Sequence, residues 1–515
     1  MDITIILLYL GAMLAFGWWG KRRASNSSEY LVAGRRLGGV LYTSTMAAVV
    51  IGGASTVGGV GLGYKYGISG MWLVVSIAAG VLLLSLLFAA RIQRLKVYTV
   101  SGMLKLRYGI DATGASGLVM MAYTLMLTVT STIAYATIFN VLFGFDRTLS
   151  VVLGGLIVVA YSAMGGMWSI TLTDVVQFVI KTIGVFVLLL PFTWSKAGGY
   201  AGIKERVGEQ ALGLGTIGTG TIITFFVVYT LGILIGQDIW QRVFTAKSPE
   251  VARWGGVTAG IYCLLYGVAG ALIGLAASAL MPDIGSSDDV YADVAVHVLP
   301  VGLSGIVLAA AVAAMMSTAS GALIATATVA RQDVLPLVAQ IFGRTRPELD
   351  TSDPEADVRG NRLYVIVIGL VSIVIAALIN DIVSALTIAY DILVGGLLVP
   401  ILGGLVWKRA TGTAAMAAMA VGTLATIATM FVVGDVMANE PVYVGLVSAL
   451  VVFVATSLFT EPTPANVMSV WNARVSGKDE EEPVPVPAPS VASTSTPSGA
   501  STSTPSVAST STPIA

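Results

Sequence analysis

The run Gly52-Gly53-Ala54-Ser55-Thr56 lies within an apolar segment of residues 38–64, which is long enough to cross a membrane as a helix. Glycine has no Cβ atom and loses more backbone freedom in a helix than any other residue, so adjacent glycines weaken a helix. Non-helical backbone at membrane depth is tolerated only where it lines a cavity. The run therefore predicts a broken membrane helix beside a cavity. The alternative is that these glycines only allow helices to pack closely.

The composition of the whole chain supports a protein that is embedded in a membrane. Its 515 residues are 56% hydrophobic and 11% charged, whereas soluble domains carry about 25% charged residues. The 28 Lys and Arg residues balance 28 Asp and Glu residues, so no net charge attracts nucleic acid. One cysteine and one histidine cannot form an internal disulfide or a histidine-based metal site. We therefore expect neither an enzyme nor a nucleic-acid partner, and no cofactor.

Thirteen apolar segments of the chain are candidates for membrane spans. They lie near residues 2–20, 38–64, 69–90, 117–143, 149–167, 173–194, 219–241, 252–281, 302–330, 362–380, 383–407, 412–433 and 441–459. Lys and Arg gather on the cytoplasmic side of a membrane. If the N-terminus is outside, the outer segments contain only a few of the 28, namely Lys65, Arg147, Lys196, Lys204 and Arg206. This asymmetry predicts a multi-pass protein of the cell membrane with a cytoplasmic C-terminus.

A second weak point lies five spans later, in the segment of residues 219–241. It contains Gly232 and the run Gly236-Gln237-Asp238. Interrupted helices at matching positions of two halves indicate the binding site of a transporter. We therefore expect an all-α membrane fold with two five-helix repeats, inverted because each repeat has an odd number of spans. The expected divisions are an N-terminal extra helix and loop at 1–37, repeats at 38–194 and 195–411, two extra helices at 412–460 and a disordered Ser/Thr/Pro tail at 461–515.

Polar side chains within the apolar spans are candidates for a functional site, because they are unfavourable in lipid. Ser317 and Thr318 are adjacent hydroxyls in the segment 302–330, and Asp174 begins the segment 173–194. A monovalent cation that has lost its water needs oxygen ligands, which hydroxyls and freed carbonyls near Ala48 and Ile51 would supply. The alternative is that both hydroxyls bond back to the preceding turn of their own helix.

Two further charged residues lie inside spans. Lys181 is expected to pair with a carboxylate or to extend its amine toward the membrane boundary. Asp391 lies too deep in the segment 383–407 for such an extension. If Asp391 contacts the solute, the solute should carry an amino or amide donor. If it caps a neighbouring backbone group, its role is structural.

At five places in order, the chain resembles the sodium:solute symporter family. The matching stretches are Ser28-Glu29-Tyr30-Leu31-Val32-Ala33-Gly34-Arg35; residues 161–169 followed by 173–177; Gln241-Arg242 with Ala246-Lys247-Ser248; Met316-Ser317-Thr318; and Pro400 followed by Trp407-Lys408-Arg409. The resemblance covers about residues 1–460. It implies a 5+5 inverted-repeat core with extra helices, and sodium-coupled uptake of a solute.

The resemblance also implies positions for the ions and the solute. The implied sodium ligands are the carbonyl groups of Ala48, Ile51 and Ala314 and the side chains of Ser317 and Thr318. Asp174 corresponds to an acid associated with a sodium exit path or a second sodium ion. The candidate solute contacts are Ser55, Thr56, Gln237, Asp238 and Asp391. Ser55, Gly236 and Val50 replace residues that bind sugar or matter in the proline branch, which argues against both solutes.

We therefore predict sodium-coupled uptake of an amino acid, a urea- or amine-type compound or a monocarboxylate, by a protein that functions as a monomer in the bilayer. A channel is one alternative, but paired broken helices around a midplane site favour alternating access. A membrane sensor of the same fold is another alternative. The tail of residues 461–515 is too short and too biased in composition to hold a signalling domain.

Overall fold

The computed structural model describes residues 2–109, 113–343, 353–379, 382–434 and 438–477, which are helical and contain no β-strand. The first helices are α1 (Asp2–Lys21), α2 (Ser27–Val32), α3 (Gly39–Val50), α4 (Gly59–Tyr66), α5 (Trp72–Leu83), α6 (Ala89–Arg94), α7 (Val100–Tyr108), α8 (Thr113–Phe143) and α9 (Arg147–Thr182). The middle helices are α10 (Leu190–Lys196), α11 (Gly199–Val207), α12 (Thr219–Phe225), α13 (Leu231–Ile235), α14 (Gln237–Val243), α15 (Gly256–Leu280) and α16 (Val290–Val298). The last helices are α17 (Leu303–Val329), α18 (Leu335–Ile341), α19 (Pro354–Leu378), α20 (Ile382–Val406), α21 (Gly412–Val433), α22 (Glu440–Phe459) and α23 (Ala465–Ser476).

Short segments of tighter or wider helix connect many of these elements. The π-helical segments are η2 (Ala54–Gly58), η4 (Leu84–Phe88), η5 (Ile183–Leu189), η7 (Phe226–Thr230), η8 (Val251–Gly255) and η9 (Ala330–Val334). The 3₁₀ segments are η1 (Ala33–Arg35), η3 (Gly67–Met71) and η6 (Gln210–Leu212). A helix satisfies its backbone hydrogen bonds within itself, which is why long apolar segments of this kind suit a lipid environment.

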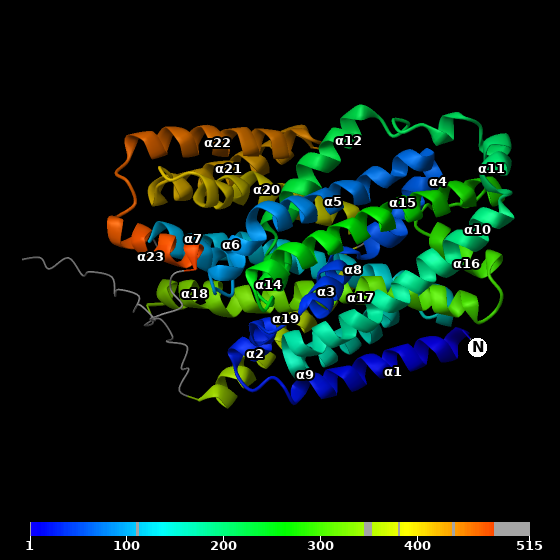
Figure 1. Ribbon diagram of the computed structural model, residues 1–515, viewed down its shortest axis with the longest axis horizontal. Coiled ribbons are helices and arrows are strands. Elements are labelled where there is room, and N and C mark those ends of the chain that lie inside the picture. The colour runs from blue at the N-terminus through cyan, green and yellow to red at the C-terminus, as the bar shows by residue number, and fades with distance from the viewer. Residues whose placement is uncertain (1, 110–112, 344–352, 380–381, 435–437, 478–515) are drawn as a thin grey trace, which may run out of the picture. The chain divides into compact units, whose positions relative to one another are not determined.

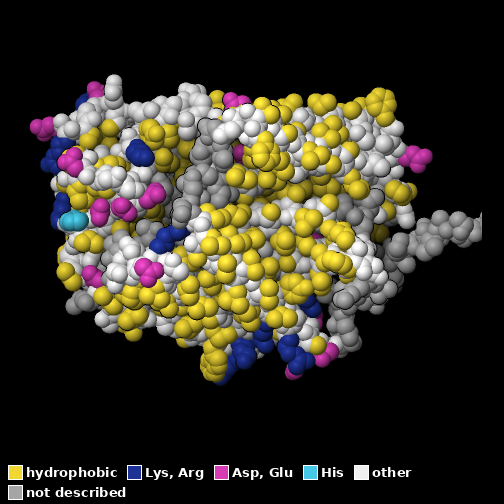
Figure 2. Space-filling model, turned by 180° about the vertical axis from the view of Figure 1, so that it is seen from behind, with side chains coloured by type: hydrophobic (Ala, Val, Ile, Leu, Met, Phe, Trp, Pro, Cys, Tyr) yellow, Lys and Arg dark blue, Asp and Glu magenta, His cyan; other side chains and the backbone are white. Residues whose placement is uncertain are grey.

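The most apolar helices are long enough to cross a membrane. In the described part of the chain, ten helical runs meet this condition, or eleven when the bent pair Thr219–Ile235 and Gln237–Val243 counts as one span. On the face seen in Figure 2, hydrophobic side chains cover a broad area, and most charged side chains lie near its margins. Large apolar side chains such as Leu8, Val187 and Phe431 are exposed, as expected for surfaces that contact lipid.

Helix α17 is the central element of the described structure. It contacts α1, α3, α8, α9 and α19, and almost all of its residues are buried. In Figure 1, α1 runs alongside α9, and α21 alongside α22, in agreement with their contacts. The position of α17 places Ser317 and Thr318 in the middle of the packed helices.

Both predicted helix breaks are present. Helix α3 ends at Val50, and Ile51 has a non-helical ψ of 84° before the chain resumes a helix at Gly53. The second break lies at Gly236, with φ −60° and ψ 128°, and the helices on either side of it are bent by 48°. A Cβ atom at Gly52 would collide with Thr318 Oγ1, so glycine at this position permits the close approach of α17. The break and the close packing that the sequence offered as alternatives therefore occur together.

The expectation of a disordered tail from residue 461 is wrong for the stretch that forms α23. Trp471 is buried, and Arg474 Nη1 donates to the carbonyl of Leu95 at 3.0 Å. Arg94 Nη1 donates in return to the carbonyl of Val475 at 3.2 Å. Helix α23 thus docks on α6 and α7, with Met468 and Val475 packed beside Trp471. The rest of the predicted tail, from residue 478, lies outside the described residues.

Candidate ion and solute site

The end of α3 presents backbone carbonyl groups to α17. In an unbroken helix the carbonyl of Ala48 would accept from the Gly52 N–H, but that N–H bonds instead to Val50 O at 3.2 Å. The carbonyl of Ala48 is therefore available to other partners. Carbonyl oxygens at the C-terminal end of a helix carry partial negative charge and favour a cation. The break in the sequence Ile51-Gly52 thus creates one side of a cation site.

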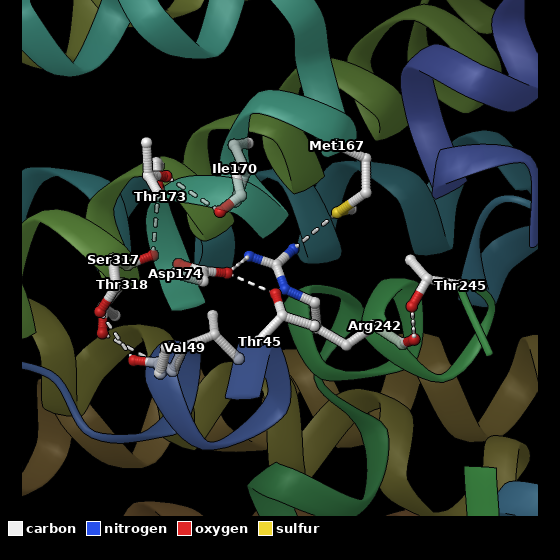
Figure 3. A network of polar contacts seen from close by, with 12 residues as sticks. Thr45, Val49, Met167, Ile170, Thr173, Asp174, Arg242, Thr245, Ser317 and Thr318 are labelled. Carbon is white, nitrogen blue, oxygen red and sulfur yellow. Dashed lines mark hydrogen bonds and ion pairs between the residues drawn. The ribbon is translucent and has the colours of Figure 1, made fainter. Parts of the chain in front are cut away.

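The hydroxyl groups of α17 form the other side. Ser317 Oγ lies 2.7 Å from Ala48 O and 2.8 Å from Ala314 O. Thr318 Oγ1 lies 2.8 Å from Val49 O and 3.4 Å from Ala314 O. Figure 3 shows the hydroxyl of Thr318 directed at Val49 of α3. Each hydroxyl therefore contacts a carbonyl of the preceding turn of its own helix, as the alternative prediction stated, and also a carbonyl of the broken helix.

The amine of Lys181 lies among these oxygens. Lys181 Nζ donates to Ala48 O at 3.0 Å, to Ile51 O at 3.1 Å and to Ser317 Oγ at 3.3 Å. The side chain is completely buried. The expectation that Lys181 pairs with a carboxylate or extends to the membrane boundary is therefore wrong, because its hydrogen bonds are made to backbone and hydroxyl oxygens within the core. The structure brings Ala48, Ile51, Ala314, Ser317 and Thr318 together, and it places an ammonium group in contact with the oxygens of Ala48, Ile51 and Ser317.

Asp174 lies in the same helix as Lys181 and has different partners. Its Oδ2 atom accepts from Thr45 Oγ1 and, at 3.3 Å, from Arg242 Nη2 (Figure 3). Arg242 Nη1 also lies 3.3 Å from the sulfur of Met167. Asp174 and Arg242 are both completely buried. Through Thr45 and Arg242, Asp174 connects α9 to α3 and α14. The other carboxylate oxygen, Asp174 Oδ1, has no hydrogen-bond partner among the described residues.

A cavity of about 380 Å³ lies beside the first helix break. Of the predicted solute contacts, Ser55 and Asp238 line it, together with Thr318 of the oxygen cluster. Other polar or aromatic lining residues are Thr130, Ser131, Phe225, Tyr229, Asp288 and Tyr390. The cavity and the oxygen cluster therefore share Thr318, which contacts both.

The remaining predicted solute contacts do not line this cavity. Thr56 Oγ1 lies 3.1 Å from the hydroxyl of Tyr266. Gln237 binds the backbone near α7, where Oε1 accepts from the Val100 N–H at 2.8 Å and Nε2 donates to Tyr98 O at 3.1 Å. Asp391 is 1% exposed, and its Oδ2 atom has no hydrogen-bond partner in the described part of the chain. Gln237 thus has a structural explanation, and Asp391 has none.

A group of tyrosines around Asp238 was not found from the sequence. Tyr123 OH donates to Asp238 Oδ1 at 3.3 Å and lies 3.2 Å from the hydroxyl of Tyr390. The ring of Tyr390 packs edge-on against those of Tyr123 and Tyr229, with centroids 4.9 Å and 5.5 Å away. Tyrosines are common in apolar spans, and no local pattern distinguishes those that face a cavity. Their convergence depends on the packing of α8, η7 and α20.

Three kinds of comparison with known proteins agree with this geometry. A model of the sodium:solute symporter family matches residues 30–422. The sodium/pantothenate symporter of Escherichia coli (strain K12) is 25% identical over 488 residues, which cover 90% of this chain and 98% of the relative. The sodium/proline symporter of Staphylococcus aureus (strain JH9) is 27% identical over 456 residues, covering 82% and 84%.

Two solved structures show the same fold. The substrate-bound outward-open state of a Na+-coupled sialic acid symporter superposes with a TM-score of 0.79 at 19% identity, covering 90% of this chain and 98% of the other. Mhp1, a nucleobase-cation-symport-1 family transporter in a closed conformation, superposes with a TM-score of 0.53 at 16% identity, covering 88% and 99%. At these identities the similarity describes the helical arrangement alone.

Proposed function

The chain belongs to the sodium:solute symporter family, and on this basis we propose that it takes up a small organic solute by alternating access, coupled to the entry of sodium. Sodium-coupled solute symport is the activity that the family and its homologues support, and these homologues are transporters rather than enzymes. The observation that carries the proposal is the solute-sized cavity that adjoins the first helix break, between α3 and η2. Such a break at membrane depth is typical of a transporter site.

We further propose thirteen membrane crossings. The run Ala54–Arg94 has 41 residues and the run Arg147–Lys196 has 50, and each is too long for one crossing of a hydrocarbon layer about 30 Å thick. Each contains a glycine with a positive φ, 63° at Gly67 and 55° at Gly166, where the chain can turn. Dividing both runs there supports thirteen crossings. With the bias of Lys and Arg, it also supports an outer N-terminus and a cytoplasmic C-terminus.

This count also supports two inverted repeats. The breaks at Ile51-Gly52 and Gly236 lie in the first helix of each proposed repeat, at 38–194 and 195–411. Related broken helices at corresponding places are the expected signature of such repeats. The solute cavity has lining residues from both, including Ser55 from the first repeat and Asp238 from the second. A single chain therefore supplies both sides of the cavity, which supports function as a monomer.

The charges at the cavity favour a solute that carries an amine. Asp238 and the exposed Asp288 are its acidic lining residues, and the lining contains no Lys or Arg among the described residues. The rings of Tyr229 and Tyr390 also line it, and aromatic faces attract organic cations. A carboxylate without an amine would meet only repulsion from Asp238. Among the predicted classes, amino acids and amine-type compounds are therefore favoured over monocarboxylates.

We propose Asp174 as the position that sodium contacts. Its Oδ1 atom is a buried carboxylate oxygen without a hydrogen-bond partner among the described residues, and hard cations prefer oxygen ligands. Its Oδ2 atom is held by Thr45 and Arg242, which fixes the orientation of the free oxygen. Arg242 contacts Oδ2 and not Oδ1, so a sodium ion would bind at the Oδ1 side of the carboxylate, away from the guanidinium contact.

The experiment is uptake of labelled proline, choline, urea, pantothenate and acetate into proteoliposomes that contain the full-length protein. We expect at least one amine-bearing compound to accumulate above its external concentration when a sodium gradient is imposed, and the accumulation to collapse when an ionophore dissipates that gradient. Liposomes with equal sodium on both sides are the control. Downhill entry that never exceeds equilibrium would indicate a channel. The absence of uptake of every compound would argue for a sensor of the same fold.

A further inference from the structure

The ammonium group of Lys181 uses all of its hydrogen-bonding capacity on the oxygen cluster. A lysine ammonium has three N–H donors and no acceptor. The three contacts of Nζ, to Ala48 O, Ile51 O and Ser317 Oγ, lie between 3.0 and 3.3 Å. These are ordinary lengths for N–H···O bonds or slightly above them. The number of donors and the number of acceptors therefore match, and the group is satisfied without a water or a carboxylate.

The acceptors of Lys181 are the oxygens that the family resemblance assigns to sodium. Ala48 O and Ile51 O come from the broken end of α3, and Ser317 Oγ comes from α17. The carbonyl end of a helix attracts positive charge of either kind, metal or ammonium. A second cation placed among the same oxygens would lie next to the ammonium and be repelled by it. The residues present therefore do not fit a sodium ion at this cluster.

Among the described residues, no carboxylate forms an ion pair with Lys181. Asp174, on the same helix, forms its ion pair with Arg242 of α14, and it interacts with Lys181 electrostatically without a direct ion pair. Cys263 of α15 is a buried free thiol that interacts electrostatically with Lys181. Tyr9 of α1 is engaged with Gln177 Nε2 at 3.1 Å. The neighbouring groups of α3 and α17 are carbonyls and hydroxyls, so the cluster itself stabilises the ammonium.

We propose that Lys181 is a built-in cation that takes the place of sodium at the cluster of Ala48, Ile51, Ala314, Ser317 and Thr318. The cluster then holds α3 against α17 with a charge that belongs to the chain and is not transported. Sodium that drives uptake must bind elsewhere. This inference rests on the proposed function, because it assumes that sodium drives uptake. It removes one of the ion positions that the family resemblance implies.

The test is equilibrium binding of ²²Na⁺ to the purified full-length protein. We expect Ser317→Ala with Thr318→Ala to leave the ²²Na⁺ binding of the protein unchanged, because no sodium contacts these hydroxyls while Lys181 is present. We expect Lys181→Ala to gain one additional equivalent of bound sodium. Adding both hydroxyl substitutions to Lys181→Ala should remove that gain. Lys196→Ala, at an exposed lysine of α10, is the matched control and should bind as the unaltered protein does.

Two results would overturn the proposal. One is loss of ²²Na⁺ binding when Ser317→Ala and Thr318→Ala are introduced with Lys181 intact. The other is a folded Lys181→Ala protein that binds no additional sodium, because the vacated cluster would then not be a cation site. If thermal unfolding shows that Lys181→Ala does not fold, the test rests on one comparison alone. That comparison is the ²²Na⁺ binding of the unaltered protein against that of the variant with Ser317→Ala and Thr318→Ala, in which Lys181 is intact.

The outcome also separates this proposal from the proposed function. Binding of ²²Na⁺ that survives the double hydroxyl substitution and disappears in an Asp174→Asn protein shown by thermal unfolding to be folded supports both. Absence of any saturable ²²Na⁺ binding in the unaltered protein contradicts sodium coupling, whereas the gain in Lys181→Ala still tests the role of Lys181.

Discussion

Arg242 and Asp174 form an ion pair between α14 and α9 in which neither side chain is exposed. Removing one partner of a buried pair leaves an uncompensated charge that water cannot reach, which is strongly destabilising. The same carboxylate also accepts from Thr45 of α3. These two contacts connect both broken helices to the helix that carries Lys181, so the pair stabilises the arrangement around the oxygen cluster.

We predict that Arg242→Met lowers the free energy of unfolding by about 3–5 kcal/mol, since Asp174 remains buried without its partner. Chemical denaturation in detergent is the measurement. The double variant Arg242→Met with Asp174→Asn should recover most of this loss, because neither charge remains. A double variant that is destabilised by the sum of the two single effects would contradict the role of the pair.

Asp238 and Asp391 are both buried acids, but they lie in different surroundings. Asp238 lines the cavity and Asp391 does not. We predict that Asp238→Asn raises the half-saturation concentration of an amine-bearing solute about tenfold or more, as loss of a charged hydrogen bond costs about 1.5–3 kcal/mol. Asp391→Asn serves as the comparison and should leave this value unchanged. Saturation uptake in proteoliposomes measures both, and a rise confined to Asp391→Asn would move the solute site toward α20.

At the scale of elements, the contact between the break after α3 and α17 controls the site. The hydroxyls of Ser317 and Thr318 reach the carbonyls of Ala48 and Val49 only because α17 approaches closely. Gly52 permits this approach, since its missing side chain would occupy the position of Thr318 Oγ1. The geometry of the oxygen cluster therefore depends on two helices that are far apart in the sequence.

We predict that Gly52→Ala destabilises the protein by about 1–3 kcal/mol, the usual effect of forcing extra volume into a packed core. It should also abolish coupled uptake, because α17 must move away from the broken helix. Gly11→Ala in α1 is the control: no atom lies within 4 Å of the added Cβ, so stability should stay the same or rise slightly. Thermal unfolding and uptake are the measurements. Equal behaviour of the two variants would show that the close approach is not required.

At the scale of the whole molecule, the described helices extend beyond the region that the family model matches. That match ends at residue 422, whereas α22 and α23 follow it. Helix α23 is amphipathic and short, and it docks through Trp471 and Arg474 on α6 and α7. Because these helices belong to the first proposed repeat, α23 links the end of the described chain to the beginning of the fold.

We predict different results for two truncations at the C-terminus. Removal of residues 478–515 should leave unfolding and uptake unaltered, because a Ser/Thr/Pro-rich segment offers little apolar surface for docking. Removal of residues 465–515 should cost about 3–5 kcal/mol, comparable to the loss of a buried tryptophan. Thermal unfolding and uptake at matched expression are the tests. A strong effect of the shorter truncation would assign a role to the segment after Gly477.

The sequence by itself determined the class of the protein, its apolar helices and both helix breaks. These properties are local: hydrophobic length specifies a membrane helix, and Gly52-Gly53 and Gly236 weaken it wherever it lies. The sequence also indicated Ser317, Thr318 and Asp174, since charged residues within apolar spans are rare and the adjacent hydroxyls accompany a predicted helix break. It could not assign Lys181, because the partner of a buried charge is not encoded in its own segment.

Only the tertiary structure decided which groups meet. Lys181 reaches the carbonyls of Ala48 and Ile51 because α9 packs against the end of α3, a contact between segments more than a hundred residues apart. The tyrosines around Asp238 converge from three elements for the same reason, and Thr56 and Gln237 turn toward other partners. Composition and periodicity describe what one helix presents, whereas the chemistry of a site between helices follows from how they pack.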